Sequence, residues 1–260
     1  MTGLSVIAYA QARIQSRYGE RADAGLWLKL HNIHDLGSYL QTAQQTPLRH
    51  WVLGLSSSHS SHDIELALRQ KYRRNVDEVA SWMPTDWQKP LHWVKRLADL
   101  PVLQYLADGG EPLDWMKADP DINCFLADDP LVRVQAMRQA GNSVMVDTWQ
   151  QSGSILSGWL SQWNSLRPKS RYSNRGLQPL EKLLNDQMHE QENQQEVLLP
   201  SDYEIILDQL RLIFRRYAFQ PAAVFAYLVI VAIDLHRIRS DLMQRMYFQH
   251  GQDLVEDLPL

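Results

Sequence analysis

The side chains that could do covalent chemistry gather in two serine-containing segments. Ser56–His62 (SSSHSSH) combines five serines with two histidines, and Gly153–Gly158 (GSILSG) holds two serines between glycines. Neither contains the Gly-x-Ser-x-Gly pattern that places a nucleophilic serine on a sharp turn. The first segment is typical of a polar turn whose serines cap the following helix, and the second is compatible with helix. A Ser–His–acid triad assembled from distant parts of the chain stays open as an alternative.

Metal and nucleotide sites have weaker support. His59 and His62 are three residues apart and could chelate a metal ion if both lay on one helix face. The intervening Ser60–Ser61 favours a turn or a helix cap instead, and no further ligands stand at a suitable spacing. The patterns of a P-loop and of a dinucleotide fingerprint are both absent. The sequence therefore predicts no catalytic residue, no cofactor and no metal site.

Asp234 is the acidic residue in the most informative position, because it directly ends the apolar run Ala222–Ile233. It could be a buried ionic switch, or it could lie on the polar face of a helix and pair with Arg237. Buried carboxylates usually persist only when they are paired, so we favour the pairing. Arg237 is the preferred partner, and Arg13 or Arg17 would serve if an N-terminal helix packs alongside.

Charge and composition exclude several classes of protein. The net charge of −4 over 260 residues disfavours nucleic-acid binding, and we interpret the basic cluster of Arg69, Lys71, Arg73 and Arg74 as the solvated face of a helix. A single cysteine, Cys124, cannot form an internal disulfide and fits a reducing compartment. The N-terminal segment lacks the apolar core of a secretory signal. We therefore expect a cytoplasmic protein.

The apolar run is too short for a simple bilayer span. It covers 12 residues, whereas a transmembrane helix needs about 20. We expect a buried helix over Phe219–Phe248, acting as the central packing element, and membrane association only through partner proteins.

Apolar residues recur at spacings of three and four nearly everywhere, which predicts an all-α fold. We expect helices at about residues 3–18, 62–82 and 143–165, and from Pro200 to Tyr217. Ser60 and Asp63 have the spacing of a capping box for the second of these. Three acid–proline dipeptides between 111 and 130 predict loops and short turns. We expect one multi-helical domain over 1–260, with a subdivision near 167–177, where the chain is polar and carries Pro, Ser, Asn and Gly.

Two terminal segments resemble the family of C-type coupling subunits of V-type ATPases and ATP synthases, called d-type in eukaryotes. The N-terminal YAQARIQSR matches the family's Tyr-x-x-Ala-Arg, Thr46–Pro47 looks like its Thr-Pro turn, and Ile64–Leu68 is similar to its Ile-Glu-x-x-Leu. Pro221, Tyr227 and Asp234 fall in the register of the family's last helix, Asp234 standing for its Glu and Arg237 for its Asn. Residues of about 84–200 match no part of the family. The interaction candidates are Tyr9, Arg13, Arg17, Tyr227, Asp234, Arg237 and Arg239.

The resemblance implies a funnel-like body of three related helical subdomains. Such a protein sits on the membrane rotor ring of a rotary ATPase, accepts the lower end of the central stalk, and does no catalysis itself. Two other functions stay open: a stand-alone helical adaptor or regulator, and an enzyme of unrecognised type with its active site in an all-α cavity.

Overall fold

The computed structural model describes residues 3–107, 110–123, 125–127, 129–169, 174–193 and 200–256, and every regular element in these ranges is a helix. The predicted all-α fold is confirmed. Cys124, part of the expected linker at 167–177 and the last four residues lie outside the described ranges. The α-helices are α1 (Gly3–Gly19), α2 (Ala24–His31), α3 (Leu36–Ala43), α4 (Arg49–Val52), α5 (Ser61–Ser81), α6 (Thr85–Trp93), α7 (Leu100–Ala107), α8 (Asp114–Ala118), α9 (Pro120–Asn123), α10 (Pro130–Met137), α11 (Ser143–Ser152), α12 (Ile155–Leu166), α14 (Gln178–Asn193), α15 (Pro200–Arg216) and α16 (Pro221–Glu256). Three shorter elements are the 3₁₀ helices η1 (Val94–Ala98) and η3 (Arg175–Leu177) and the π-helical turn η2 (Arg138–Asn142).

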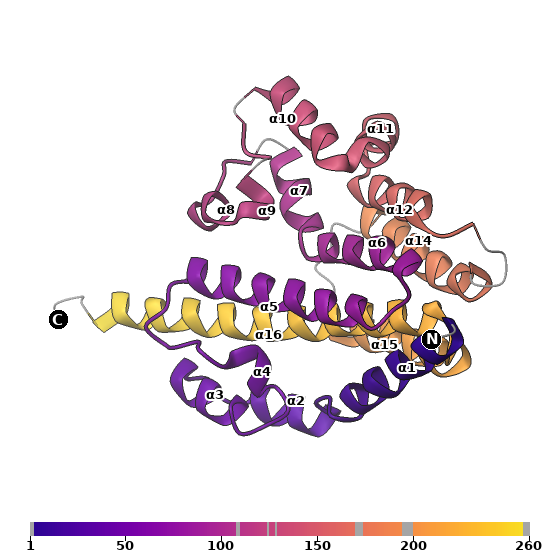
Figure 1. The fold of residues 1–260 in the computed structure, drawn as a ribbon. Coiled ribbons are helices and arrows are strands. Elements are labelled where there is room, and N and C mark those ends of the chain that lie inside the picture. The colour runs from indigo at the N-terminus through magenta and orange to yellow at the C-terminus, as the bar shows by residue number, and fades with distance from the viewer. Residues whose placement is uncertain are drawn as a thin grey trace.

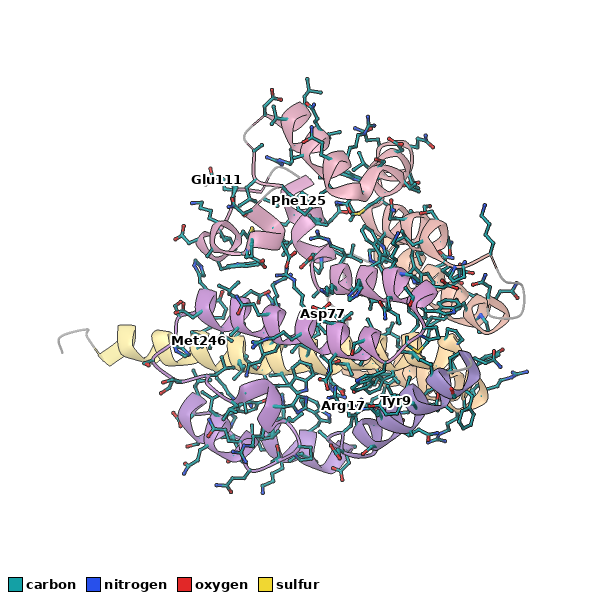
Figure 2. All side chains as sticks on the ribbon, in the orientation of Figure 1. Tyr9, Arg17, Asp77, Glu111, Phe125 and Met246 are labelled. Atoms are coloured by element: carbon teal, nitrogen blue, oxygen red, sulfur yellow. The ribbon has the colours of Figure 1, made fainter. Side chains whose placement is uncertain are left out.

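The helices lie in three layers around α16 (Figure 1). α16 runs through the middle with α5 and α15 beside it, α1–α4 lie on one side, and α6–α12 lie on the other. Figure 2 shows side chains from all three layers filling the space between the ribbons. The residues from Ala222 to Val231 are all buried, whereas Phe219 and Tyr247 are exposed. The prediction of a central packing element over Phe219–Phe248 is therefore confirmed for Ala222–Val231.

The length and composition of α16 also satisfy a test for membrane spans. Among the described residues, Pro221–Tyr247 is one helical segment of 27 residues that could cross a bilayer, and 78 % of its most apolar window is buried inside the protein. The core helix of a soluble protein has the same properties, so this is weak evidence of a span.

Local signals set the start of α5 as predicted. The Ser60 side chain accepts a hydrogen bond from the Asp63 N–H at 3.1 Å, and the Ser60 N–H donates to the Asp63 carboxylate at 3.0 Å. This reciprocal capping box satisfies two backbone donors that the first turn of a helix leaves unpaired. His59 lies in the preceding turn, where its Nδ1 accepts from the Ser56 N–H at 3.1 Å.

The predicted single helix at 143–165 is wrong, because the chain breaks it into α11 and α12 at Gly153. Gly153 has a φ of +74°, a left-handed conformation that ends a helix cheaply only at glycine. The two helices then fold against each other so closely that a Cβ on Gly158 would lie 2.4 Å from the Met145 carbonyl oxygen. Gly158 therefore permits the contact between the two helices.

The basic cluster on α5 is not a simple solvated face, and this correction explains how α5 is anchored. Arg69 and Arg73 are buried. Arg73 bonds Asp119 at 2.6 Å and Asp99 at 2.8 Å, and Arg69 bonds Asp99 at 3.1 Å. Because each guanidinium meets a carboxylate, the cost of burying the charges is partly offset. The network attaches α5 to the segment that carries η1, α8 and α9.

Candidate functional site

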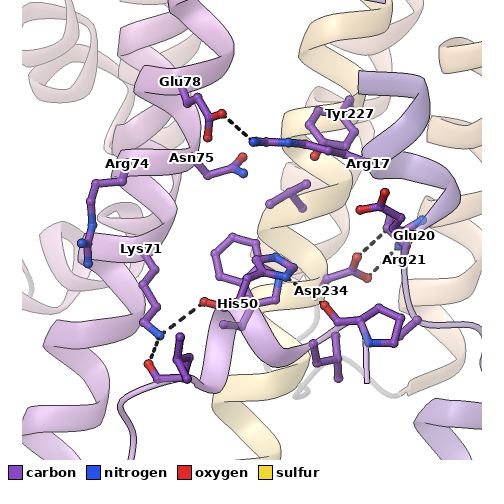
Figure 3. A pocket seen from close by; sticks show the side chains of 16 residues that line it. Arg17, Glu20, Arg21, His50, Lys71, Arg74, Asn75, Glu78, Tyr227 and Asp234 are labelled. Atoms are coloured by element: carbon purple, nitrogen blue, oxygen red, sulfur yellow. Dashed lines mark hydrogen bonds and ion pairs between the residues drawn. The ribbon is translucent and has the colours of Figure 1, made fainter. Parts of the chain in front are cut away.

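The main polar cavity lies where α1, α4, α5 and α16 meet, and it contains three of the predicted interaction residues (Figure 3). Its volume is about 800 Å³, within the range of small-molecule and peptide sites. Its charged and polar lining residues are Arg17, Glu20, Arg21, His50, Lys71, Arg74, Asn75, Glu78, Tyr227 and Asp234.

Asp234 is paired, as expected, but its partner is none of the three that the sequence suggested. Arg21 donates two hydrogen bonds to its carboxylate, from Nε at 2.6 Å and from Nη2 at 2.7 Å. Both side chains are largely buried, with 13 % of Arg21 and 6 % of Asp234 exposed. Arg21 follows the end of α1 at Gly19, and Figure 3 shows its side chain beside Asp234 of α16.

The three expected partners of Asp234 make other contacts. Arg237 bonds Glu204 of α15 at 2.9 Å and lies over the ring of Trp27. Arg13 and Arg17 instead face α5, where both guanidinium groups stack on the ring of Trp82. The i, i+3 spacing therefore did not decide the pairing, because side-chain direction and tertiary packing placed Arg237 on another side of α16.

Arg17 and Tyr227 form one wall of the cavity. Arg17 bonds Glu78 of α5 at 2.6 Å. Burial raises the pKa of Tyr227 to about 12, although the nearby positive charges of Arg17 and Arg21 act in the opposite direction. The Tyr227 hydroxyl is therefore protonated at neutral pH and acts as a hydrogen-bonding group rather than as a base.

The opposite wall carries polar groups that the described part of the chain does not neutralise. Lys71 donates to the backbone carbonyls of Leu53 at 2.5 Å and His50 at 3.3 Å, and Arg74 donates to the carbonyl of Gln70 at 3.3 Å. Within the described residues these bonds go to carbonyls rather than carboxylates, so the two positive charges remain. Partial burial, and after it the charge of Arg74, lowers the pKa of Lys71. The buried Oδ1 of Asn75 has no hydrogen-bond partner among the residues that the structure describes.

The remaining predicted residues lie outside the cavity. Tyr9 is half exposed beside Arg13, which donates to its hydroxyl at 2.5 Å. Arg239 bonds Glu65 of α5. Sequence reasoning missed Arg21, Lys71, Arg74 and Asn75 as lining residues. Glu65, Arg69 and Arg73 recur every four residues and lie on the buried side of α5. Lys71 and Arg74 do not belong to this series, and the spacing could have marked them as cations on another side of the helix.

The arrangement is suited to binding rather than to covalent chemistry. Asp234 and Glu78 are both held in ion pairs with arginines, the third carboxylate, Glu20, accepts from the Ser16 hydroxyl at 3.5 Å, and the described lining of the cavity includes no serine, threonine or cysteine. Within the described residues no group of three or more His, Cys, Asp or Glu side chains could hold a metal ion. What remains open is the pair of cations Lys71 and Arg74, which suits a negatively charged segment of a partner.

Comparison with known proteins adds no assignment: no family model, no curated protein and no solved structure matches this chain.

Proposed function

We propose that this chain is a non-catalytic coupling subunit that links the central stalk of a V/A-type rotary ATPase to its membrane rotor ring. It would lie on the cytoplasmic side of the membrane and contact the membrane only through its partners. A funnel-like body of related helical subdomains, as in the family that the terminal segments resemble, belongs to this proposal.

One observation carries the proposal. Tyr9–Arg17 and the resembling segment that begins at Pro221 lie more than 200 residues apart in the sequence, yet α1 and α16 pack against each other and share one cavity. Arg17 from the first segment and Tyr227 and Asp234 from the second all line it. Of the residues that carry the resemblance, Pro47, Tyr227 and Asp234 line this cavity, whereas Tyr9 and Arg13 lie outside it. The convergence of Pro47, Tyr227 and Asp234 supports a shared binding site.

The charge of the cavity suggests how a partner would bind. Lys71 and Arg74 project from α5 on the side opposite Arg17 and Tyr227 (Figure 3). An acidic segment of the stalk or ring would find two cations that the described residues leave without a carboxylate partner. Such contacts are screened by salt, so association should weaken as ionic strength rises.

The test is co-purification with the stalk and ring subunits encoded in the same genome. The tagged chain is co-expressed with them as wild type, as Lys71→Glu/Arg74→Glu, and as a control, Lys29→Glu/Lys89→Glu, which changes the charge equally at exposed positions outside the cavity. We expect the wild type and the control to retain stalk or ring subunits, the cavity variant to lose them, and none of the isolated chains to hydrolyse ATP.

Other outcomes are equally informative. Retention of the subunits by the wild type and by both variants would place the partner elsewhere on the surface. Failure of the wild type to bind any stalk or ring subunit, together with a partner from an unrelated pathway, would overturn the proposal in favour of a stand-alone adaptor.

A further inference from the structure

A second cavity of about 330 Å³ lies between α5, the η1–α7 segment, α8 and α16, away from the polar cavity. Leu68, Tyr72 and Leu235 of the main core line it. Val102, Trp115 and Met116 line it as well and belong to a smaller group of buried residues that also holds Leu106 and Ile122. The volume of the cavity is at the low end of the range for small-molecule sites.

The wall of this cavity is strongly apolar. Leu68 of α5, Val102 of α7, Trp115 and Met116 of α8, and Leu235 of α16 line it, and all of them are buried. Leu113 lies at its edge and is partly exposed. An apolar ligand would fill space that side chains of the protein leave open, and it would be removed from water there.

The polar side of the same cavity carries two guanidinium groups, Arg69 and Arg239, and one carboxylate, Glu65. Asp99 does not line the cavity but bonds Arg69 at 3.1 Å, so these two positive charges meet two carboxylates. Partial burial, and then Arg239, lowers the pKa of the His236 ring below the usual value, so the ring adds no charge at pH 7.

The two arginines differ in how far the protein engages them. Arg69 is buried and bonds Glu65 at 2.8 Å, Asp99 at 3.1 Å and the Ala98 carbonyl at 2.5 Å. Arg239 bonds Glu65 as well, but 45 % of its side chain is exposed. A guanidinium group has five N–H donors in a planar fork, so Arg239 keeps donors that can bind a second anion.

We propose that this cavity binds a small amphiphile with an anionic head, such as a medium-chain carboxylic acid. The tail lies among Leu68, Val102, Trp115 and Leu235, and the carboxylate bonds Arg239 at the mouth. This proposal does not depend on the coupling function, since it uses a different cavity and different residues.

The affinity should follow the length of the tail. Burying one methylene group contributes about 0.8 kcal/mol, which is about fourfold in affinity. The affinity of straight-chain carboxylates should rise by about this factor per carbon until the cavity is full and then stop rising.

The experiment is calorimetric titration of the full chain with decanoate and with decanol, each below the concentration at which it aggregates. We expect decanoate to bind at least tenfold more tightly than decanol. Arg239→Gln should remove that preference without changing decanol binding. Arg237→Gln is the matched control, because Arg237 lies on the same helix and outside this cavity, and it should bind both ligands as the wild type does.

A second variant tests the apolar part of the site. Ala232 lines the cavity, and Ala232→Phe places a ring in the space of the tail, so both ligands should bind at least tenfold more weakly. Thermal unfolding of each variant checks that it is folded. The proposal is overturned if decanoate does not bind the wild type at millimolar concentration, or if Ala232→Phe and Arg239→Gln bind both ligands as the wild type does. Binding to anionic phospholipid vesicles without binding of free decanoate would also overturn it, because a membrane surface would then be the ligand.

Discussion

The buried pair of Arg21 and Asp234 should contribute strongly and cooperatively to stability. Asp234→Leu leaves Arg21 with a buried charge and no carboxylate, and Arg21→Met leaves Asp234 in the same state. Removing one partner of a buried ion pair costs about 3–5 kcal/mol. The entropy of unfolding for 260 residues is about 0.55 kcal/mol per kelvin, so each single variant should lower the melting temperature by about 5–9 °C.

The double variant Arg21→Met/Asp234→Leu shows whether the stability costs of the two single variants are coupled or independent. Neither charge is then left unpaired, and both replacements are apolar and of moderate size, so the cost should fall to about 1–2 kcal/mol. Urea unfolding followed by circular dichroism measures all four corners of the cycle. The control is Glu78→Gln, which breaks the more exposed Arg17–Glu78 pair, with 30 % and 45 % of the two side chains exposed, and should cost less than about 1 kcal/mol.

Two results would refute this reasoning. If the costs of the single variants simply add in the double variant, the two charges are not coupled in the folded protein. If Asp234→Leu costs no more than Glu78→Gln, water reaches the pair and burial does not set its energy.

Three further predictions test the packing around α16 and between α11 and α12. Gly158→Ala should destabilise the protein by about 2 kcal/mol, because the new Cβ would meet the Met145 carbonyl oxygen at 2.4 Å. Helix propensity alone predicts a gain in stability of about 1 kcal/mol. The sign of the change in unfolding free energy, measured in urea, decides between the two effects. Tyr227 has a pKa raised from 10.0 to about 12 in the folded protein, so its contribution to the free energy of unfolding is complete below pH 10. That contribution, up to about 2.7 kcal/mol, is lost as pH rises toward 12. Tyr227→Phe should lose less stability than the wild type between pH 10 and 12, and an equal loss would contradict the assignment. Leu228→Asp buries an unpaired charge at a fully buried position and should cost more than about 4 kcal/mol. Its control, Tyr247→Asp at an exposed position of the same helix, should melt close to the wild type. A soluble Leu228→Asp protein with unchanged melting would place this helix on the surface.

The errors in the predicted site share one physical cause. The partner of Asp234 was sought at helical spacing along α16, yet Arg21 comes from a turn 213 residues away. Two neighbouring cations on α5 were interpreted as exposed, yet Arg69 and Arg73 are buried against Asp99 and Asp119. Side chains this long can reach several partners, and the arrangement of the helices decides which partner is within reach.

The sequence by itself determined the features that depend on local interactions. The helical periodicity, the capping box at Ser60 and the apolar run after Pro221 each involve residues within a few positions of one another, so their energies can be estimated without knowing the fold. The break of the helix at Gly153 is also local, but one glycine with flanking helical residues does not reveal a left-handed conformation. Only the tertiary structure decided which charges are paired and where space remains between the helices. Both depend on how helices that are far apart in the sequence pack together, and residue spacing within one helix carries no information about that.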